Sequence, residues 1–456
     1  MKLYQDKVFT KKLLSLMLPI AFQQFMLNLV SASDAIMLDI IGQSELSAVA
    51  LAGQVQFVLS LFIAAVTIGT NTFTAQFFGK KDISSIEKIF AIATAFSVFI
   101  SAVFTIAAAL CPAQIMRLFT NDELLITKGA EYLKIVSPSY LFCGVSQIYM
   151  CIMKNCEMAT KSSVISSVCV IFDAVMNAVM ILGLIGFPKM GIAGAALSTA
   201  IARFVEMIWA ITALARAKKI KLKVKHITSV DKALLKDYIK YTSPVLGNEL
   251  VWGVGLTMIS VIMGHLGGDA VAANSIASIT KNLVVCFCLG LGSGGGIMIG
   301  NELGAGNLAK AKEYGKRICR LSVLFGILAG MVILILSPAI LHFSLLTDRA
   351  TEYLKYMLLI LSYYMIGKSV NSTVIAGVFC AGGDSKFGFW CDTIVIWGIV
   401  VPIGAIFAFI LKLPVTTVYF ILCLDEFIKL PAVYRHYKKY LWVKDLTDYD
   451  NKRENA

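Results

Sequence analysis

Long apolar stretches separated by short polar segments dominate the sequence. A helix that crosses the hydrocarbon core of a bilayer needs about 20 mostly apolar residues. Gly, Ser, Thr, Asn and Gln recur inside these stretches, which favours close packing and hydrogen bonds between helices. The pattern predicts an all-α integral membrane protein with twelve transmembrane helices, at about residues 13–40, 47–75, 89–112, 130–153, 162–186, 191–214, 239–264, 270–299, 318–342, 352–378, 388–411 and 414–433.

The composition agrees with this pattern. Hydrophobic residues make up 58% of the chain and charged residues 15%, whereas soluble domains are about half apolar and a quarter charged. Most of the eleven cysteines lie inside apolar stretches, which is typical of small buried apolar residues rather than of disulfides. The four histidines lack ligand spacing and there is no nucleotide-binding loop. We therefore expect that the protein is not an enzyme and that it holds neither a cofactor nor a structural metal.

Basic residues predict how the chain crosses the membrane. The side that carries both termini has these basic positions in its loops: Lys80, Lys81, Lys88, Lys154, Lys161, residues 216–240, Lys310, Lys312, Lys316, Arg317, Arg320 and Lys386. The opposite side has only Arg117, Lys128, Lys134, Lys189, Arg349, Lys355 and Lys412. The positive-inside rule then places both termini in the cytoplasm of a plasma (inner) membrane protein. The basic loops of this topology account for the net charge of +13, and we expect them to contact anionic lipid head groups of the bilayer. We therefore expect no nucleic-acid partner.

The two halves of the chain repeat at an offset of 225 residues. Pro19 falls on Pro244, and Gln76-Phe77-Phe78-Gly79 falls on Asn301-Glu302-Leu303-Gly304. Six helices per half give both halves the same orientation, which predicts parallel repeats. The predicted organisation is an N-terminal six-helix lobe at 1–215, a basic linker at 216–238, a C-terminal six-helix lobe at 239–436 and a cytoplasmic tail at 437–456.

Several motifs, spread over nearly the whole chain, resemble the multidrug and toxic compound extrusion (MATE) family. They include SASDAIMLDIIG after Pro19, ELSAVALAGQ, GFPKMGIAGAALSTAIARFVE, LGLGSGGGIMIGNELGAGNLAKAKE and GVFCAGGDSKFGFWCD. The resemblance implies two lobes around a central cavity that opens to one side of the membrane at a time. It also implies export of amphipathic organic compounds, cationic drugs or metabolites first, in exchange for H⁺ or Na⁺, by a monomer. A lipid-linked oligosaccharide or polysaccharide flippase of the same superfamily is the alternative.

Polar residues in the N-terminal lobe are candidates for binding substrate or coupling ion. An ionisable side chain in mid-membrane costs at least about 2.5 kcal/mol and is a functional hypothesis by default. Asp34 lies in the outer part of the first stretch, where the family commonly has an acid. Asp173 and Asn177 share a helix face, in the opposite order to the family's Asn–Asp pair, and Thr199 belongs to GAALST. Na⁺ at Asp34 or Asp173 is one possibility, and a hydrogen-bonded pair that only ties helices together is the other.

The C-terminal lobe offers four candidates: Glu249, Lys281, Lys368 and Asp392. Glu249 matches the family's acid in the seventh span, where Na⁺ is again one possibility, and both lysines fall near mid-depth. A buried charge must be paired or have its pKa shifted. We expect Glu249 to pair with Lys281 or Lys368, in a charge-relay or anion-tolerant pocket or in a purely structural ion pair. Two further groups are predicted to pair on one helix face and to be structural: Arg203 with Glu206, and Lys429 with Asp425 and Glu426.

Overall fold

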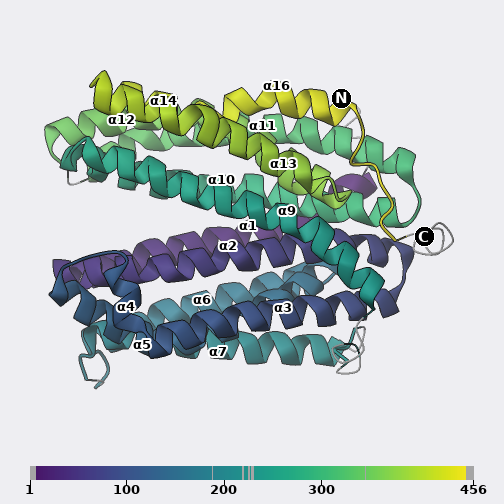
Figure 1. Ribbon diagram of the computed structural model, residues 1–456, viewed down its shortest axis with the longest axis horizontal. Helices are drawn as coiled ribbons and strands as arrows, with labels where there is room; N and C mark the ends of the chain where they lie inside the picture. The colour runs from purple at the N-terminus through teal and green to yellow at the C-terminus, as the bar shows by residue number, and fades with distance from the viewer. Residues whose placement is uncertain are drawn as a thin grey trace. The chain divides into compact units, whose positions relative to one another are not determined.

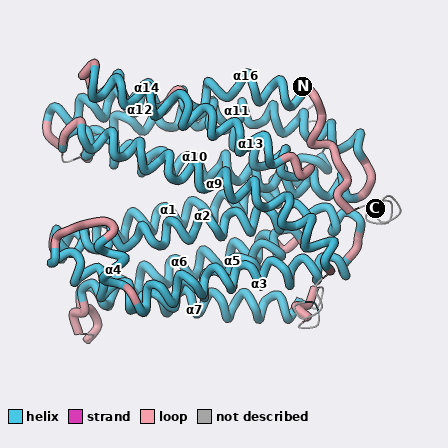
Figure 2. Tube along the Cα trace, in the orientation of Figure 1, coloured by secondary structure: helices cyan, strands magenta, loops and turns pink. Residues whose placement is uncertain are grey.

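The computed structural model describes residues 7–186, 188–217, 220–223, 226, 231–344 and 346–447, without the side chains of 32, 34–36, 38–41 and 43. Within these ranges the chain is helical and contains no strand (Figure 2). The helices form two compact units. The C-terminal unit comprises Met1–Ala21, Asn71–Asp82 and Ile239–Ala456, and the N-terminal unit comprises Phe22–Thr70 and Ile83–Tyr238.

In the described part of the first half, the chain forms six long helices and one short helix. Their bounds are α1 (Lys7–Ile41), α2 (Gln43–Lys80), α3 (Ile83–Leu110), α4 (Pro112–Arg117), α5 (Glu123–Asn155), α6 (Ala159–Leu182) and α7 (Gly191–Ala217). Within the N-terminal unit, α5 packs against α3, α6 and α7 (Figure 1). Asp122 caps α5 through the main-chain N–H groups of Leu124 and Leu125, and Gly183 ends α6 with a left-handed φ of 72°.

The second half is more interrupted. It contains α9 (Lys232–His265), α10 (Gly268–Gly304), α11 (Leu308–Phe343), α12 (Asp348–Asn371), η2 (Ser372–Phe379), α13 (Ser385–Asp392), η3 (Thr393–Val400), α14 (Val401–Ala405), η4 (Ile406–Ile410), α15 (Val415–Leu422) and α16 (Asp425–Lys438). The first two turns of α9 belong to the N-terminal unit, where the hydroxyl of Tyr238 donates to the carbonyl of Val66 at 3.1 Å. Helix α9 thus begins at Lys232, inside the stretch 216–238 that the sequence predicts as a linker.

The predicted twelve-helix architecture is confirmed, with one change in the last span. Eleven helices in the described part of the chain are long and apolar enough to cross a membrane. The twelfth predicted stretch, 414–433, forms α15 and α16 instead of one helix. The break falls at Cys423 and Leu424, immediately before three charged residues, Asp425, Glu426 and Lys429.

Three segments of the C-terminal unit, η2, η3 and η4, are π-helical. Such segments are rare and frequently adjoin functional sites. Pro402 accounts for part of this, because proline lacks an N–H donor and its ring clashes with the carbonyl four residues earlier, which here lies inside η3. Two junctions between α-helix and π-helix hold buried polar residues, Asn371 before η2 and Asp392 before η3.

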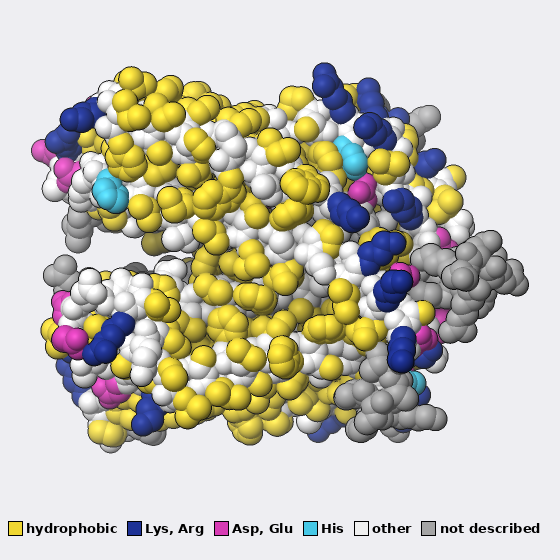
Figure 3. All heavy atoms as spheres, viewed as in Figure 1, with side chains coloured by type: hydrophobic (Ala, Val, Ile, Leu, Met, Phe, Trp, Pro, Cys, Tyr) yellow, Lys and Arg dark blue, Asp and Glu magenta, His cyan; other side chains and the backbone are white. Residues whose placement is uncertain are grey.

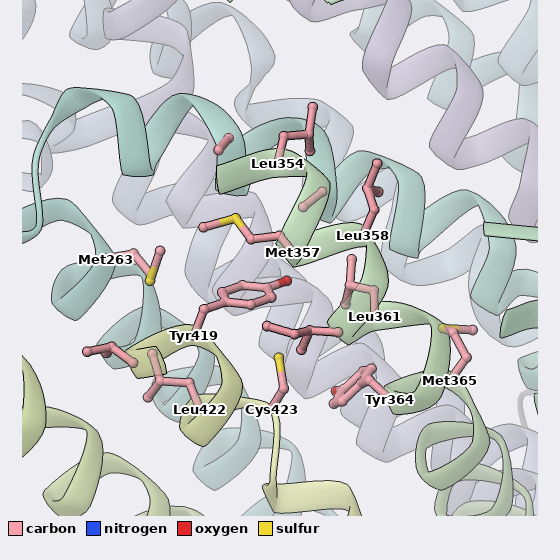
Figure 4. Packing of buried hydrophobic residues seen from close by; sticks show 14 of the residues in the cluster. Met263, Leu354, Met357, Leu358, Leu361, Tyr364, Met365, Tyr419, Leu422 and Cys423 are labelled. Carbon is pink, nitrogen blue, oxygen red and sulfur yellow. The ribbon is translucent and has the colours of Figure 1, made fainter. Parts of the chain in front are cut away.

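An apolar core fixes the helices of the C-terminal unit next to these junctions. Figure 4 shows Met263 from α9, Leu354, Met357, Leu358 and Leu361 from α12, and Tyr419 and Leu422 from α15 meeting in one cluster. Tyr364 and Cys423 lie at its edge, one turn before Lys368 and two residues before Asp425. The core thus holds α12 and the α15–α16 break at a fixed distance from each other.

The outer surface of the helices is also apolar. On the face shown in Figure 3, hydrophobic side chains cover the middle of the helices in each unit. On α11 the exposed side chains include Val323, Leu324, Ile327, Leu328 and Met331. So large an exposed apolar area is rare on soluble proteins and marks a surface that lipid covers.

The C-terminal ends of α2 and α10 make a reciprocal contact that follows the sequence repeat. A Cβ atom added to Gly79 would lie within 3.0 Å of the main-chain oxygen of Asn301, and one added to Gly304 would lie within 3.0 Å of the main-chain oxygen of Gln76. Gly79 and Gly304, like Gln76 and Asn301, are 225 residues apart. Gly79 contacts Asn301 and Gly304 contacts Gln76, so the two helix ends are related by a local two-fold axis.

The segment after α16 packs against the C-terminal end of α2. The buried amide of Gln76 donates to the carbonyls of Ala381 at 2.8 Å and Lys444 at 3.1 Å, and accepts from the N–H of Leu446 at 2.7 Å. Trp442 is fully buried beside Gly315. The predicted tail therefore includes an ordered segment, Tyr440–Thr447, that belongs to the C-terminal unit.

We predict that Gly79→Val destabilises the protein. The new side chain would collide with the main chain of Asn301, and overpacking of this kind costs about 1–3 kcal/mol. Thermal unfolding of the detergent-solubilised protein, followed by loss of the monodisperse chromatographic peak, measures the effect. Gly264→Val in α9 is the matched control, since no atom lies within 4 Å of a Cβ there. Equal thermal midpoints for both variants would contradict the close contact.

Candidate functional site

Four buried charged side chains and one half-buried lysine meet inside the C-terminal unit. We call Lys368, Asp392, Asp425, Glu426 and Lys429 the C-terminal charge cluster. Lys368 comes from α12, Asp392 is the last residue of α13, and the other three lie in the first two turns of α16. Helix α16 packs against α12, α13 and η3, so the tertiary packing joins segments that are far apart in the sequence.

The local structure of α16 places its three charges on one side. The break after α15 starts a new helix at Asp425, and acids in a first turn are stabilised by the N–H groups that point out of the helix end. Lys429 follows Asp425 by four residues and Glu426 by three, which is the spacing of neighbours on one helix face. The predicted grouping of these three residues is confirmed.

The ammonium of Lys429 lies among three carboxylates. Its Nζ atom is 2.8 Å from Oδ1 of Asp392, 3.4 Å from Oδ2 of Asp425 and 3.8 Å from Oε2 of Glu426. The exposed fraction is 2% for Lys429, 6% for Asp392, 7% for Asp425 and 1% for Glu426. Water therefore cannot screen these charges, and removing one partner from such a buried pair costs about 3–5 kcal/mol.

Glu426 has further partners on α12. Its Oε1 is 3.2 Å from Nζ of Lys368, and the amide nitrogen of Asn371 donates to its Oε2 at 2.8 Å and to its main-chain carbonyl at 2.7 Å. The Lys368 ammonium also lies 5.2 Å from the ring centroid of Trp252 on α9, within range of a cation–π interaction. Glu426 is thus held by two ammoniums and an amide.

Asp392 connects the cluster to α9. When the Asn248 amide is oriented to satisfy its neighbours, its nitrogen donates to Oδ2 of Asp392 at 2.9 Å and to the carbonyl of Gly388 at 3.0 Å. Both oxygens of Asp392 then have a partner, Asn248 on one side and Lys429 on the other. The cluster therefore links α9, α12, α13 and α16.

The expected pairing of Glu249 with a lysine is wrong. Lys368 pairs with Glu426, because the packing of α12 on α16 brings these two side chains together. Glu249 on α9 is half-buried, and no ammonium or guanidinium among the described residues lies within 4.0 Å of its carboxylate. Lys281 on α10 lies 6.0 Å from the ring of Tyr364, and no carboxylate in the described part of the chain is within 4.0 Å of it.

The N-terminal unit contains a smaller buried ion pair. Arg203 and Glu206, both on α7, pair at 2.9 Å as predicted. Glu206 is fully buried and accepts a second hydrogen bond, from the Ser146 hydroxyl of α5, at 3.2 Å. The two charges of the pair therefore neutralise each other, and the bond from Ser146 connects α7 to α5.

Three of the four predicted N-terminal candidates, Asp173, Asn177 and Thr199, lie on the neighbouring helices α6 and α7. The buried amide oxygen of Asn177 on α6 accepts a hydrogen bond from Ser198 on α7, while Thr199, the next residue, is half-buried. Asp173 lies one turn before Asn177 on α6 and is half-buried. The side chain of Asp34 lies outside the described residues. Ser198 was not predicted from the sequence, although it belongs to the same GAALST motif as Thr199.

Two other residues were missed because amides carry no formal charge. Asn371 and Asn248 complete the hydrogen bonds of Glu426 and Asp392, but a lone asparagine inside an apolar stretch is common in packed helix bundles. The available signal was positional: Asn371 follows Lys368 by three residues, on the same helix face.

Comparison with known proteins gives a consistent result. The MatE family model matches residues 19–179 and 244–420. The "Uncharacterized transporter YisQ" of Bacillus subtilis is 22% identical over 443 residues, 96% of each chain, and the "Probable multidrug resistance protein NorM" of Thermotoga maritima is 22% identical over 373 residues, 80% of this chain and 78% of its own.

Solved structures share the fold. A MOP superfamily transporter from Pyrococcus furiosus has a TM-score of 0.86 at 16% identity, over 94% of this chain and 95% of its own. A mutant of the Vibrio cholerae MATE transporter VcmN has a TM-score of 0.86 at 16% identity, over 96% of this chain and 98% of its own. The family match covers both repeats, the twelve-span fold agrees with it, and the chain belongs to the MATE family of membrane transporters.

Proposed function

We propose that this protein is a secondary active efflux transporter, an antiporter that exports amphipathic organic compounds in exchange for H⁺ or Na⁺. The observation that carries the proposal is the presence of half-buried or buried carboxylates inside the spans of both units, Asp173 and Glu206 in one and Glu249, Asp392 and Asp425 in the other. Acids at such positions are rare and mark ion or substrate pathways.

Relatives support export as the direction of transport. The Thermotoga maritima protein is named a probable multidrug resistance protein, and a Photorhabdus laumondii protein, 23% identical over 418 residues, is named a multidrug resistance protein. A membrane transporter can provide resistance to a compound by moving it out of the cell. We extend the same role to this chain.

Ion coupling follows from the energetics of a buried carboxylate. A protein with two conformations responds to a ligand that binds one of them better, and the substrate and the ion then influence each other through that equilibrium. A proton or Na⁺ that neutralises an acid inside the membrane stabilises the conformation in which the acid is most deeply desolvated. Asp34, Asp173, Asn177 and Thr199 are the proposed ligands in the N-terminal half.

The C-terminal half supplies Glu249, Lys281, Lys368 and Asp392 as further candidates for ion or substrate binding. Aromatic side chains near these residues, such as Trp252 beside Lys368, suit bulky organic compounds. A cationic drug or metabolite is the proposed substrate class, since Glu249 lacks an ammonium partner among the described residues. The Pyrococcus furiosus transporter is described as having a binding pocket of reverse polarity, so transport assays should include anions and zwitterions.

The proposed location is the plasma membrane, with both termini in the cytoplasm and the protein working as a monomer. On the visible face of the C-terminal unit, most Lys and Arg side chains lie toward the end that carries α16 (Figure 3). By the positive-inside rule this end faces the cytoplasm.

We predict gradient-dependent export of ethidium, an amphipathic organic cation, from proteoliposomes that contain the purified protein. The pH gradient and the Na⁺ gradient are imposed separately, and at least one of them should drive transport. Dissipating that gradient with an ionophore should stop transport. The measurement is ethidium fluorescence against time. Transport that continues unchanged without any gradient would favour a flippase or a channel over an antiporter.

We also predict that Glu249→Gln and Asp34→Asn each lower coupled export by an order of magnitude or more. Each change removes a charge that the coupling ion would neutralise and leaves a side chain of nearly the same size. The exposed acid Glu123 gives the matched control, Glu123→Gln, which should transport like the wild type. Chromatography of all three variants checks folding, and wild-type coupling in both site variants would refute the site assignment.

A further inference from the structure

We propose that the ammonium of Lys429 occupies the place of a coupling cation in the C-terminal charge cluster, so that this cluster exchanges a proton at Asp425 and excludes Na⁺. The proposal rests on the antiport function proposed above and deepens it, because it assigns the ion that this one site handles. It makes Lys429 the residue that determines ion specificity there.

The geometry places the ammonium where a metal ion would need to be. Hard cations are held by several oxygen ligands at short distances, and the cluster supplies such oxygens from Asp392, Asp425 and Glu426. Nζ of Lys429 already lies 2.8, 3.4 and 3.8 Å from one oxygen of each. A second cation among these oxygens would sit within a few ångströms of the ammonium, where like charges repel strongly because little water is present.

The charge balance leaves room for one proton. With all groups ionised, three carboxylates and two ammoniums, those of Lys368 and Lys429, carry one net negative charge. A single proton on one carboxylate makes the cluster neutral, which is the favourable state for charges removed from water. A proton needs no set of ligands and fits between side chains already in contact.

The number of side-chain partners favours Asp425 as the proton carrier. Glu426 is held by Lys368 and Asn371, and Asp392 is held by Lys429 and Asn248. Asp425 has a single side-chain partner in the described part of the protein, Lys429 at 3.4 Å. Asp425 therefore has the fewest side-chain partners of the three, and protonation there breaks the fewest side-chain interactions.

Charged groups on every neighbouring helix bear on this site. They are Lys368 on α12, Asp392 on α13, Glu426 and Lys429 on α16 itself, Lys281 on α10, which interacts electrostatically with Asp425 and Glu426, and Glu249 on α9, which interacts with Asp392 and Lys368. When Asp425 takes a proton, Lys429 keeps its bond to Asp392 and loses its attraction to Asp425. The proton thus weakens the contact of Lys429 with Asp425 inside α16 and leaves the contact of Lys429 with Asp392, which joins α16 to α13.

The first test measures ²²Na⁺ binding to the purified full-length protein. The C-terminal charge cluster should bind no Na⁺ in the wild type or in Lys429→Arg. The same holds for the control Lys316→Ala, which changes an exposed lysine. Lys429→Ala should gain about one bound Na⁺ per protein, and adding Asp425→Asn should remove it. Na⁺ should also raise the thermal midpoint of Lys429→Ala relative to choline at equal ionic strength, since a ligand that binds only the folded state stabilises it.

Two results would overturn the proposal. One is Na⁺ bound by the wild type and lost in Asp392→Asn or Asp425→Asn, a comparison that remains valid even where Lys429→Ala does not fold. The other is a folded Lys429→Ala protein that gains no Na⁺. These binding results do not depend on transport, so they separate this proposal from the antiport function.

The second test follows protons in proteoliposomes loaded with a pH-sensitive dye. Asp425→Asn should reduce ethidium-coupled proton movement at least tenfold, whereas Glu352→Gln, an exposed acid on α12, should leave it unchanged. Unaltered proton coupling in Asp425→Asn would overturn the assignment of the proton to this residue. Absence of ethidium export under every gradient, in the wild type, would instead refute the proposed antiport.

Discussion

Charge removed from water has to be compensated by charge or hydrogen bonds nearby, and this constraint organises both units of the protein. Transferring an isolated ion into a low-dielectric interior costs several kcal/mol even after relaxation. The N-terminal unit meets the constraint by pairing Arg203 with Glu206. The C-terminal unit meets it with a larger group in which Lys429 contacts three carboxylates and Lys368 supports Glu426. In each case the counter-charge is part of the same unit, so the acids are stabilised without an external ion.

Irregular helix geometry makes the larger cluster possible. The α15–α16 break lets α16 begin at Asp425 inside the unit, where its free N–H groups favour the two acids of its first turn. Asp392 lies at the end of α13, directly before a π-helical segment that Pro402 helps to explain. Regular helices would satisfy more of their own backbone hydrogen bonds but would turn these side chains to other faces. The arrangement that holds the charges therefore depends on local departures from ideal helices, which are common near functional sites.

Packing on both sides of the cluster limits how these segments can move. The apolar core of Figure 4 fixes α12 and α15. At the C-terminal ends of α2 and α10, the contact between these helices admits only glycine at Gly79 and Gly304. Closely packed interiors respond to a change in charge by switching between discrete arrangements rather than by deforming continuously. A proton gained or lost in the cluster is thus suited to shift the balance between two packings of α16.

Hydrophobicity, periodicity and charge position are properties of the chain in one dimension, and they were enough to predict the twelve apolar spans, the two repeats and the basic character of one side. They also predicted the pairs within one helix, Arg203 with Glu206 and Lys429 with its neighbours on α16, since helical spacing fixes those contacts. Tertiary packing alone decided that Lys368 pairs with Glu426 rather than with Glu249. It also decided that Asp392 pairs with Lys429. Those contacts depend on how each helix is rotated and where it breaks, and a mid-membrane charge in the sequence carries no information on which neighbouring face it will meet.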